Sequence, residues 1–281
     1  MKSWMKISLT VVITAMICIP AMATTMGTSS YTLNVAGSTT VQPLMLELQH
    51  GFEKFADVQM NVTGGGSGVG ISSTLNGVAD IGMLSRDLKP GEGQGLLVEH
   101  IIAMDAVVMI VNADAGLGTS PDLTLKQLAD IYSGAITHWS EVGGSAREIP
   151  VITREENSGT RDCFEAALKT VDGNFRMKEN VNSVNSTGAV LQMVNSIPGA
   201  IGYINLNVST ETFGSIHQVT VDGIAPTPKT ILDGTYEISR DLVLVTKGEP
   251  TGMVDFFINW IMSERGQDIV EETGFVRVDG R

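Results

Sequence analysis

Two spacings of hydrophobic residues alternate along the sequence. Short apolar runs typical of β-strands occupy residues 31–36, 58–62, 101–111, 149–153 and 242–246. Other segments repeat apolar residues at the spacing of one helix face, within residues 41–55, 124–134, 160–169, 187–196 and 253–261. The runs at 101–111 and 242–246 are apolar almost throughout, which is typical of strands buried on both faces. This order predicts an α/β fold with a mainly parallel sheet and helices on both of its faces.

Local signals mark the ends of some of these helices. Thr124 and Gln127 have the spacing of a capping box, in which each side chain bonds the backbone N–H of the other residue. Gly134 follows the same helix, where a residue with positive φ commonly ends it. Pro43 fits the first turn of an earlier helix, where a missing N–H does no harm.

Four loops share one composition, with Ser, Thr, Gly or Asn placed between an apolar run and a helix. They are residues 37–40, 66–68, 157–160 and 185–188. The first N–H groups of a helix lack partners and the helix dipole is positive there, so such ends bind anions. Ser and Thr also cap helices where no ligand binds, and for any single loop that alternative is the simpler one. Four such loops together predict an oxyanion site, because strand ends gather at one edge of an open α/β sheet.

Three arginines add positive charge near these loops. Arg154 ends a predicted strand just before the third loop, Arg161 begins the helix after it, and Arg86 follows Ser85 near a strand-like segment. A guanidinium makes forked, bidentate contacts with oxyanions. An ion pair of Arg154 with a neighbouring glutamate is the open alternative.

The first 23 residues have the layout of a secretory signal peptide. Lys2 and Lys6 precede an apolar run at residues 7–19, and Ala21-Met22-Ala23 supplies an A-x-A cleavage pattern. We therefore predict that residues 1–23 are removed and that the protein acts outside the cytoplasm. A retained membrane anchor is the alternative, although this run is short for a bilayer span.

The two cysteines have different expected roles. Lipidation of Cys18 is disfavoured, because bulky Ile17 precedes it where a lipid-attachment signal has a small residue. Cys163 would then be the one cysteine of the mature chain, so no internal disulfide can form. It lies beside Phe164 on an apolar helix face, which predicts a buried structural thiol rather than a nucleophile.

Charge and motif content exclude several other functions. The formal net charge of −13 argues against nucleic-acid or anionic-membrane partners, which need clustered Lys and Arg. No P-loop pattern is present, and Val69 stands where a nucleophile elbow around Ser67 needs glycine. The histidines are dispersed without metal-ligand spacing, at His50, His100, His138 and His217. We expect no metal, no cofactor and no catalytic set.

Several of these segments, in this order, resemble the periplasmic phosphate-binding proteins that serve ABC-type phosphate transporters. The resemblance spans roughly residues 33–278 and rests on segments 36–40, 66–70, 80–86, 154–161, 198–203 and 263–267. The R-x-x-x-S-G-T run at 154–160 is the most specific of them. The resemblance implies a type II periplasmic-binding-protein fold: two doubly wound α/β lobes joined by two crossing strands, with the ligand cleft between them. On that pattern lobe I comprises residues 31–107 and 240–281, and lobe II comprises residues 108–239.

The resemblance also implies which residues contact phosphate. The expected set is Ser38, Thr39, Thr40, Ser67, Ser85 and Arg86 from the first lobe, with Arg154, Ser158, Gly159 and Thr160 from the second.

One position departs from the best-known family pattern. Where that pattern has a carboxylate that accepts the phosphate proton, this sequence has Ser85, followed by Arg86. Asp80, Asp87 or Asp105 could supply an acceptor instead. A buried carboxylate repels fully ionised sulfate, so its replacement makes discrimination against sulfate less certain.

We therefore expect an extracytoplasmic solute-binding protein, monomeric and not an enzyme, that captures inorganic phosphate and delivers it to an ABC transporter permease. A binding protein or sensor for tungstate, molybdate or sulfate is the alternative within the binding class. A secreted serine hydrolase using Ser67 or Ser158 is a remote alternative, because neither loop carries a histidine base.

Overall fold

The computed structural model describes residues 31–208 and 214–278, so the predicted signal peptide lies outside the described residues. The strands are β1 (Tyr31–Gly37), β2 (Val58–Gly64), β3 (Ile81–Leu84), β4 (Leu97–Asn112), β5 (Asp122–Leu123), β6 (Ile152–Arg154), β7 (Asn182–Val184), β8 (Ile201–Asn205), β9 (Ile216–Val221) and β10 (Ser239–Lys247). The helices are α1 (Gln42–Glu53), α2 (Ser67–Leu75), α3 (Leu125–Ser133), α4 (Gly159–Val171), α5 (Thr187–Ser196), α6 (Pro228–Leu232), α7 (Gly252–Ile261) and α8 (Glu264–Glu272). None of the helices described is long and apolar enough to cross a membrane.

The predicted ends of helices α3 and α5 are confirmed. Thr124 Oγ1 accepts from Gln127 N at 3.1 Å, and Gln127 Oε1 accepts from Thr124 N at 2.8 Å, which completes the capping box of α3. Gly134 ends α3 with φ of 87°, a left-handed conformation that glycine adopts without strain. The helix predicted at 187–196 coincides with α5.

Most strands form one sheet of order β2-β1-β3-β10-β4-β9-β5, with β8 paired to β4. β1 is parallel to β2 and β3, but β10 runs antiparallel to both β3 and β4. β4 is likewise antiparallel to β8 and β9. The prediction of a mainly parallel sheet was therefore wrong. The chain leaves the first half of the molecule on β4 and returns on β10, so these neighbouring strands must run in opposite directions.

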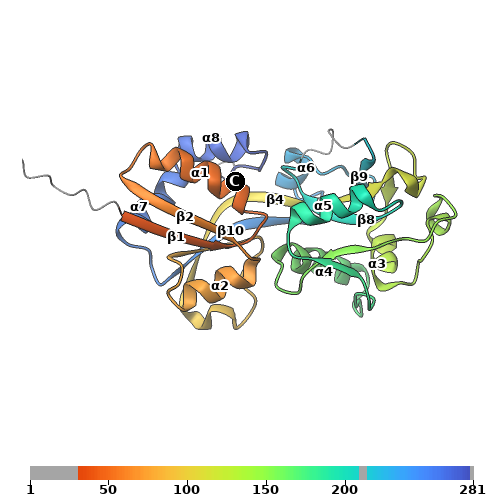
Figure 1. Cartoon of the computed structure of the whole chain (residues 1–281), viewed down its shortest axis with the longest axis horizontal. Helices are drawn as coiled ribbons and strands as arrows, with labels where there is room; N and C mark the ends of the chain where they lie inside the picture. Colours follow the sequence, from red (N-terminus) through yellow and green to blue (C-terminus); the bar gives the residue numbers. More distant parts are fainter. Residues whose placement is uncertain (1–30, 209–213, 279–281) are drawn as a thin grey trace, which may run out of the picture.

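Two hydrophobic cores divide the molecule into lobes (Figure 1). The first lobe packs α1, α7 and α8 on one face of β1–β3, with Phe52 and Trp260 in contact at its centre. Helix α2 covers the opposite face of this sheet through Ile71, which packs with Val243 and Val245 of β10. The second lobe packs α3, α4 and α5 around β8, with Tyr132, Phe164 and Tyr203 in mutual ring contact.

Strands β4 and β10 cross between the lobes and are held together by a buried ion pair. Asp105 of β4 lies opposite Arg240 of β10 in the ladder. Arg240 donates to Asp105 Oδ2 through Nη2 at 2.6 Å and Nε at 3.1 Å, and Leu206 N donates to Oδ1 at 3.0 Å. Burial raises the pKa of the Asp105 carboxyl, while the attraction of Arg240 and the backbone donors opposes that rise.

Replacing Asp105 with alanine should destabilise the protein strongly, because it leaves the Arg240 guanidinium buried without its counter-charge. We expect the free energy of unfolding to fall by about 3–5 kcal/mol, measured by urea denaturation followed by circular dichroism. The double variant Asp105→Leu, Arg240→Met removes both charges and should lose much less. Equal losses in the single and double variants would contradict this account of the buried ion pair between the crossing strands.

Candidate anion-binding site

The two lobes direct helix N-termini toward the boundary between them (Figure 1). In the first lobe, parallel strands β1 and β2 end at Gly37 and Gly64, just before α1 and α2 begin. In the second lobe, parallel strands β6 and β7 end at Arg154 and Val184, just before α4 and α5. All four predicted loops therefore lie at strand ends next to helix N-termini.

Buried hydroxyl groups from these loops meet across the lobe boundary. Thr40 Oγ1 of the first lobe lies 2.9 Å from Thr160 Oγ1 and 3.2 Å from Thr187 Oγ1 of the second. Ser67 Oγ accepts from Ser85 N at 3.1 Å and lies 3.4 Å from Ser85 Oγ. The Thr40 contacts cross the lobe boundary, whereas Ser67 and Ser85 both belong to the first lobe and lie beside Gly159 of the second. Together these residues form one polar cluster, with the lobes closed on each other.

Gly159, the first residue of α4, lets the lobes approach this closely. A Cβ atom there would lie 2.3 Å from Ser67 Oγ and 2.8 Å from Ser85 Oγ. Gly68 N also donates to Asn157 O at 3.2 Å across the same boundary. Glycine is therefore needed at residue 159 for contact between the lobes, and not for an unusual backbone angle.

Arg154 supplies the buried positive charge of the cluster. Its side chain is 2% exposed, and Nη1 donates to Thr187 Oγ1 at 3.1 Å. Nε and Nη2 donate to the two carboxylate oxygens of Glu155, each at 2.8 Å. The alternative of a glutamate partner is thus realised, but at a buried guanidinium rather than on the surface.

The backbone of Arg154 is fixed by a buried tyrosine. Arg154 N donates to the Tyr203 hydroxyl at 3.1 Å, and Thr153 Oγ1 lies 2.8 Å from the same hydroxyl. Burial raises the pKa of Tyr203 to about 12, so the phenol stays neutral at physiological pH.

Two of the predicted hydroxyls accept hydrogen bonds from nearby backbone N–H groups. Ser38 Oγ accepts from Thr40 N at 3.2 Å, so this N–H, expected to contact phosphate, already has a partner. Ser158 Oγ accepts from Arg161 N at 3.3 Å and caps α4. Thr39 Oγ1, by contrast, is a buried polar atom for which the described residues offer no hydrogen-bond partner. This hydroxyl is therefore free to bond a polar ligand or a water molecule.

Arg86 lies at the lobe boundary but contacts carboxylates. Its Nη1 and Nη2 donate to Glu92 at 2.7 and 3.0 Å, and its Nε donates to Asp162 at 2.7 Å. The sequence pattern indicated a guanidinium able to bind an oxyanion, and here the guanidinium binds two acidic side chains instead.

Thr187 is a residue of the cluster that the sequence analysis did not select. It belongs to the fourth predicted loop, but its position beside the Arg154 guanidinium depends on tertiary packing.

The acidic residues considered as proton acceptors lie outside the hydroxyl cluster. Asp80 Oδ2 accepts from Asn34 N at 2.8 Å at an exposed position, and Asp105 is engaged by Arg240. Asp87 lines a separate cavity of about 340 Å³ near the crossing strands. Glu155, held by Arg154, is the carboxylate bonded to the cluster.

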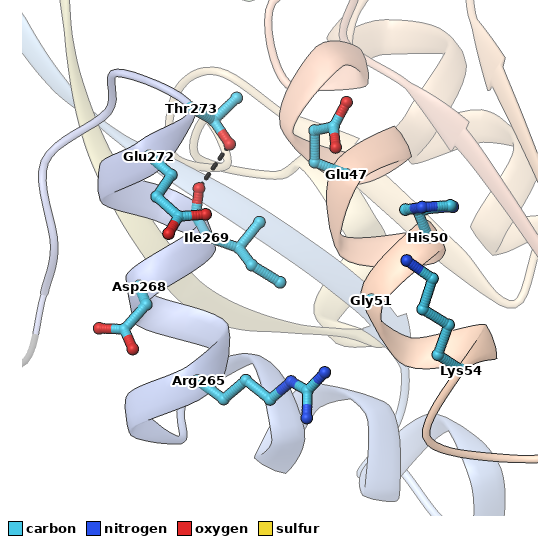
Figure 2. Close-up of a pocket in the computed structure, with 9 residues that line it drawn as sticks. All are labelled: Glu47, His50, Gly51, Lys54, Arg265, Asp268, Ile269, Glu272 and Thr273. Carbon is cyan, nitrogen blue, oxygen red and sulfur yellow. Dashed lines mark hydrogen bonds between the residues drawn. The ribbon is translucent and has the colours of Figure 1, made fainter.

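Two other hollows have different chemistry from the cluster. A groove of about 620 Å³ runs between α1 and α8, where His50, Lys54 and Arg265 share its walls with acidic side chains (Figure 2). It lies on the flank of the first lobe, away from the strand ends. Cys163 lines the cavity near the crossing strands and is only partly buried, less than the sequence predicted. Desolvation by its surroundings still raises the pKa of the thiol to about 11. That value disfavours the thiolate and therefore a nucleophilic role.

Comparison with known proteins gives consistent matches over most of the chain. A family model described as a PBP superfamily domain matches residues 22–265. The phosphate-binding protein PstS of Bacillus subtilis (strain 168) is 32% identical over 256 residues, covering 89% of this chain and 82% of that protein. A crystal structure of a candidate phosphate ABC transporter substrate-binding protein from Clostridium perfringens, with bound phosphate, has 36% identity and a TM-score of 0.81, covering 88% and 99%. An ABC-type phosphate transport receptor from Vibrio cholerae has 30% identity and a TM-score of 0.70, covering 87% and 99%.

Because the lobes approach closely at Gly159, we expect a larger residue there to leave folding intact but to impair closure of the lobes. Gly159→Ala places a methyl group between the lobes, and overpacking of this kind costs about 1–3 kcal/mol. We expect the affinity for inorganic phosphate, measured by isothermal titration calorimetry, to fall about 5- to 150-fold. The melting temperature without phosphate should stay near that of the wild type, because the open lobes do not crowd the methyl group.

Gly173→Ala is the matched control, since Gly173 follows the C-terminal end of α4 and has no atom within 4 Å of a Cβ built there. Its affinity should be unchanged. If Gly159→Ala binds phosphate as well as Gly173→Ala does, close apposition at Gly159 is not required for binding.

Proposed function

This chain belongs to the PBP superfamily and, within it, to the family of phosphate-binding proteins named PstS, and on that premise we propose that it captures inorganic phosphate for an ABC transporter permease. The observation that carries the proposal is the convergence of buried donors from both lobes on one point. Thr40, Thr160 and Thr187 meet there beside the Arg154 guanidinium. The helix N-termini behind them add positive dipole ends.

The chemistry of this cluster suits a small tetrahedral dianion. Hydroxyl and N–H groups can surround four oxygens, and each hydrogen bond to a charged group contributes about 1.5–3 kcal/mol. Thr39 Oγ1 is available as a further donor from the first lobe. Because donors come from both lobes, the full set exists only when the lobes are closed, so binding favours closure.

Selectivity follows from which groups can accept a proton. Phosphate carries a proton at neutral pH and sulfate does not. The Ser67 and Ser85 hydroxyls can each donate or accept, so they tolerate either ion. We therefore propose that phosphate binds tightly. We also propose that this site discriminates less strongly against sulfate, tungstate or molybdate than a site with a buried carboxylate would.

The hydrolase alternative gains no support from the serines concerned. Ser67 Oγ bonds Ser85, and Ser158 Oγ caps α4. Of the histidines, His100 bonds Thr246 and His138 bonds Thr137, in each case away from the cluster. The binding function accounts for the same loops without a base.

The cellular setting belongs to the same proposal. The signal-peptide pattern of residues 1–23 supports action outside the cytoplasm, and a net charge of −13 favours neither nucleic acid nor an anionic membrane surface as partner. We propose that a monomer carries phosphate to the permease, and that it needs no metal or cofactor to do so.

Arg154→Ala tests the central contact of the proposed site. We expect phosphate affinity to fall at least about tenfold, because one charge-assisted contact of about 1.5–3 kcal/mol is lost and Glu155 is left without its partner. Arg277→Ala removes an arginine that pairs with Asp268 on the first lobe, and should bind normally. Calorimetric titration with phosphate measures both. Failure of the wild type to bind phosphate would overturn the proposed function, and unchanged affinity in Arg154→Ala would overturn the role of Arg154.

Ser85→Asp tests the basis of selectivity. A carboxylate beside Ser67 accepts the phosphate proton but repels a fully ionised anion, so the ratio of phosphate to sulfate affinity should rise about tenfold or more. The measurement is competition between the two anions for the wild type and the variant, with Ser85→Ala as the uncharged control. An unaltered ratio in Ser85→Asp would place the proton acceptor elsewhere.

A further inference from the structure

A group of charged side chains connects the lobes beside the hydroxyl cluster. Arg86 and Lys89 follow β3 in the first lobe, and Asp162 lies in the first turn of α4 in the second. Arg86 Nε lies 2.7 Å from Asp162 Oδ2, and Lys89 Nζ lies 2.7 Å from Asp162 Oδ1. Both carboxylate oxygens of one second-lobe residue are thus held by cations of the first lobe.

The first lobe orients the Arg86 guanidinium by itself. Glu92 binds both terminal nitrogens of Arg86 and also accepts from Lys89 N at 2.8 Å. Arg86 Nη1 donates in addition to Asp87 O at 2.8 Å. Because these contacts lie within one lobe, Arg86 can keep its orientation when the lobes separate, with Nε still directed outward.

Asp162 has two opposed effects where it stands. A carboxylate in the first turn of α4 is stabilised by the helix dipole. The same negative charge opposes an anion at Gly159 and Thr160, which begin that helix. Closing the lobes brings Arg86 and Lys89 onto Asp162 and offsets this repulsion at the moment when the anion is enclosed.

Resting on the proposed phosphate-binding function, we propose that Arg86, Lys89 and Asp162 form a latch that holds the lobes closed, and that Arg86 is a positioning residue rather than an anion ligand. Asp162 is 19% exposed and Arg86 is 9% exposed, so their contact is largely shielded from water. The apparent affinity of a ligand scales with the populated fraction of the binding-competent state, so losing the latch weakens binding without removing any anion contact.

The substitution Asp162→Asn distinguishes the latch from simple charge repulsion, because the two predict opposite changes in phosphate affinity. Removing a negative charge near an anion would by itself strengthen binding. The latch predicts the opposite: phosphate should dissociate about tenfold faster, with an association rate within about twofold of the wild type. Stopped-flow measurement of phosphate binding and release gives both rates.

Glu165→Gln is the matched control. It removes the same charge one turn further along α4, but Glu165 pairs with Arg161 and Lys169 of its own helix. Its dissociation rate should equal that of the wild type or be slower. Lys89→Met removes only the more exposed cation, and its dissociation rate should lie between those of the wild type and Asp162→Asn.

The outcomes distinguish the latch from the function on which it rests. No phosphate binding by the wild type would refute the function itself. Normal wild-type binding with equal dissociation rates in Asp162→Asn and Glu165→Gln would refute the latch alone. Faster dissociation confined to Asp162→Asn and Lys89→Met, with melting temperatures unchanged, supports it.

Discussion

Strands β4 and β10 determine how the two halves of the site are placed, since the chain passes from one lobe to the other and back along them. Their antiparallel pairing is secured by Asp105 and Arg240 at the crossing, where Asp105 is fully buried and Arg240 nearly so. A buried ion pair gives little net stability, but it strongly penalises arrangements that separate its members. The ion pair therefore ties the two strands together at the crossing, and we infer that the lobes open by rotation about these strands. Such a rotation opens or closes the gap between the loops that end β1, β2, β6 and β7.

The two arginines beside the proposed site each have an acidic partner within their own lobe, so this balance of charge does not depend on an anion. Arg154 is paired with Glu155, and Arg86 with Glu92. The cluster therefore does not attract anions through a large excess of positive charge, which agrees with a chain of net charge −13. Attraction comes instead from hydroxyls, N–H groups and helix ends that are already oriented when the lobes meet. Short-range donors of this kind favour an ion of the right shape over anions in general, so pairing the arginines with acids favours selectivity.

Features set by local sequence were predicted well, and features set by distant contacts were not. The bounds of α5 and the capping box of α3 follow from spacing within one segment, and both are confirmed. The antiparallel direction of β10 was missed because alternating strands and helices usually imply parallel pairing, whereas a chain that returns between lobes must reverse. Helix α8 was missed as well. It begins at Glu264, only a few residues after α7, so the two apolar patterns run together.

Arg86 shows why candidate residues are easier to predict than their partners. A guanidinium next to Ser85 can bind an oxyanion or a carboxylate with nearly the same geometry, so the motif indicates a capacity without a partner. The partners of the Arg86 guanidinium are Asp162, 76 positions away, and Glu92, which binds its other side. Thr187 reaches the Arg154 side chain in the same way, across 33 positions. Local composition therefore located the loops that converge, and the tertiary fold decided which donors face the anion and which hold the lobes together.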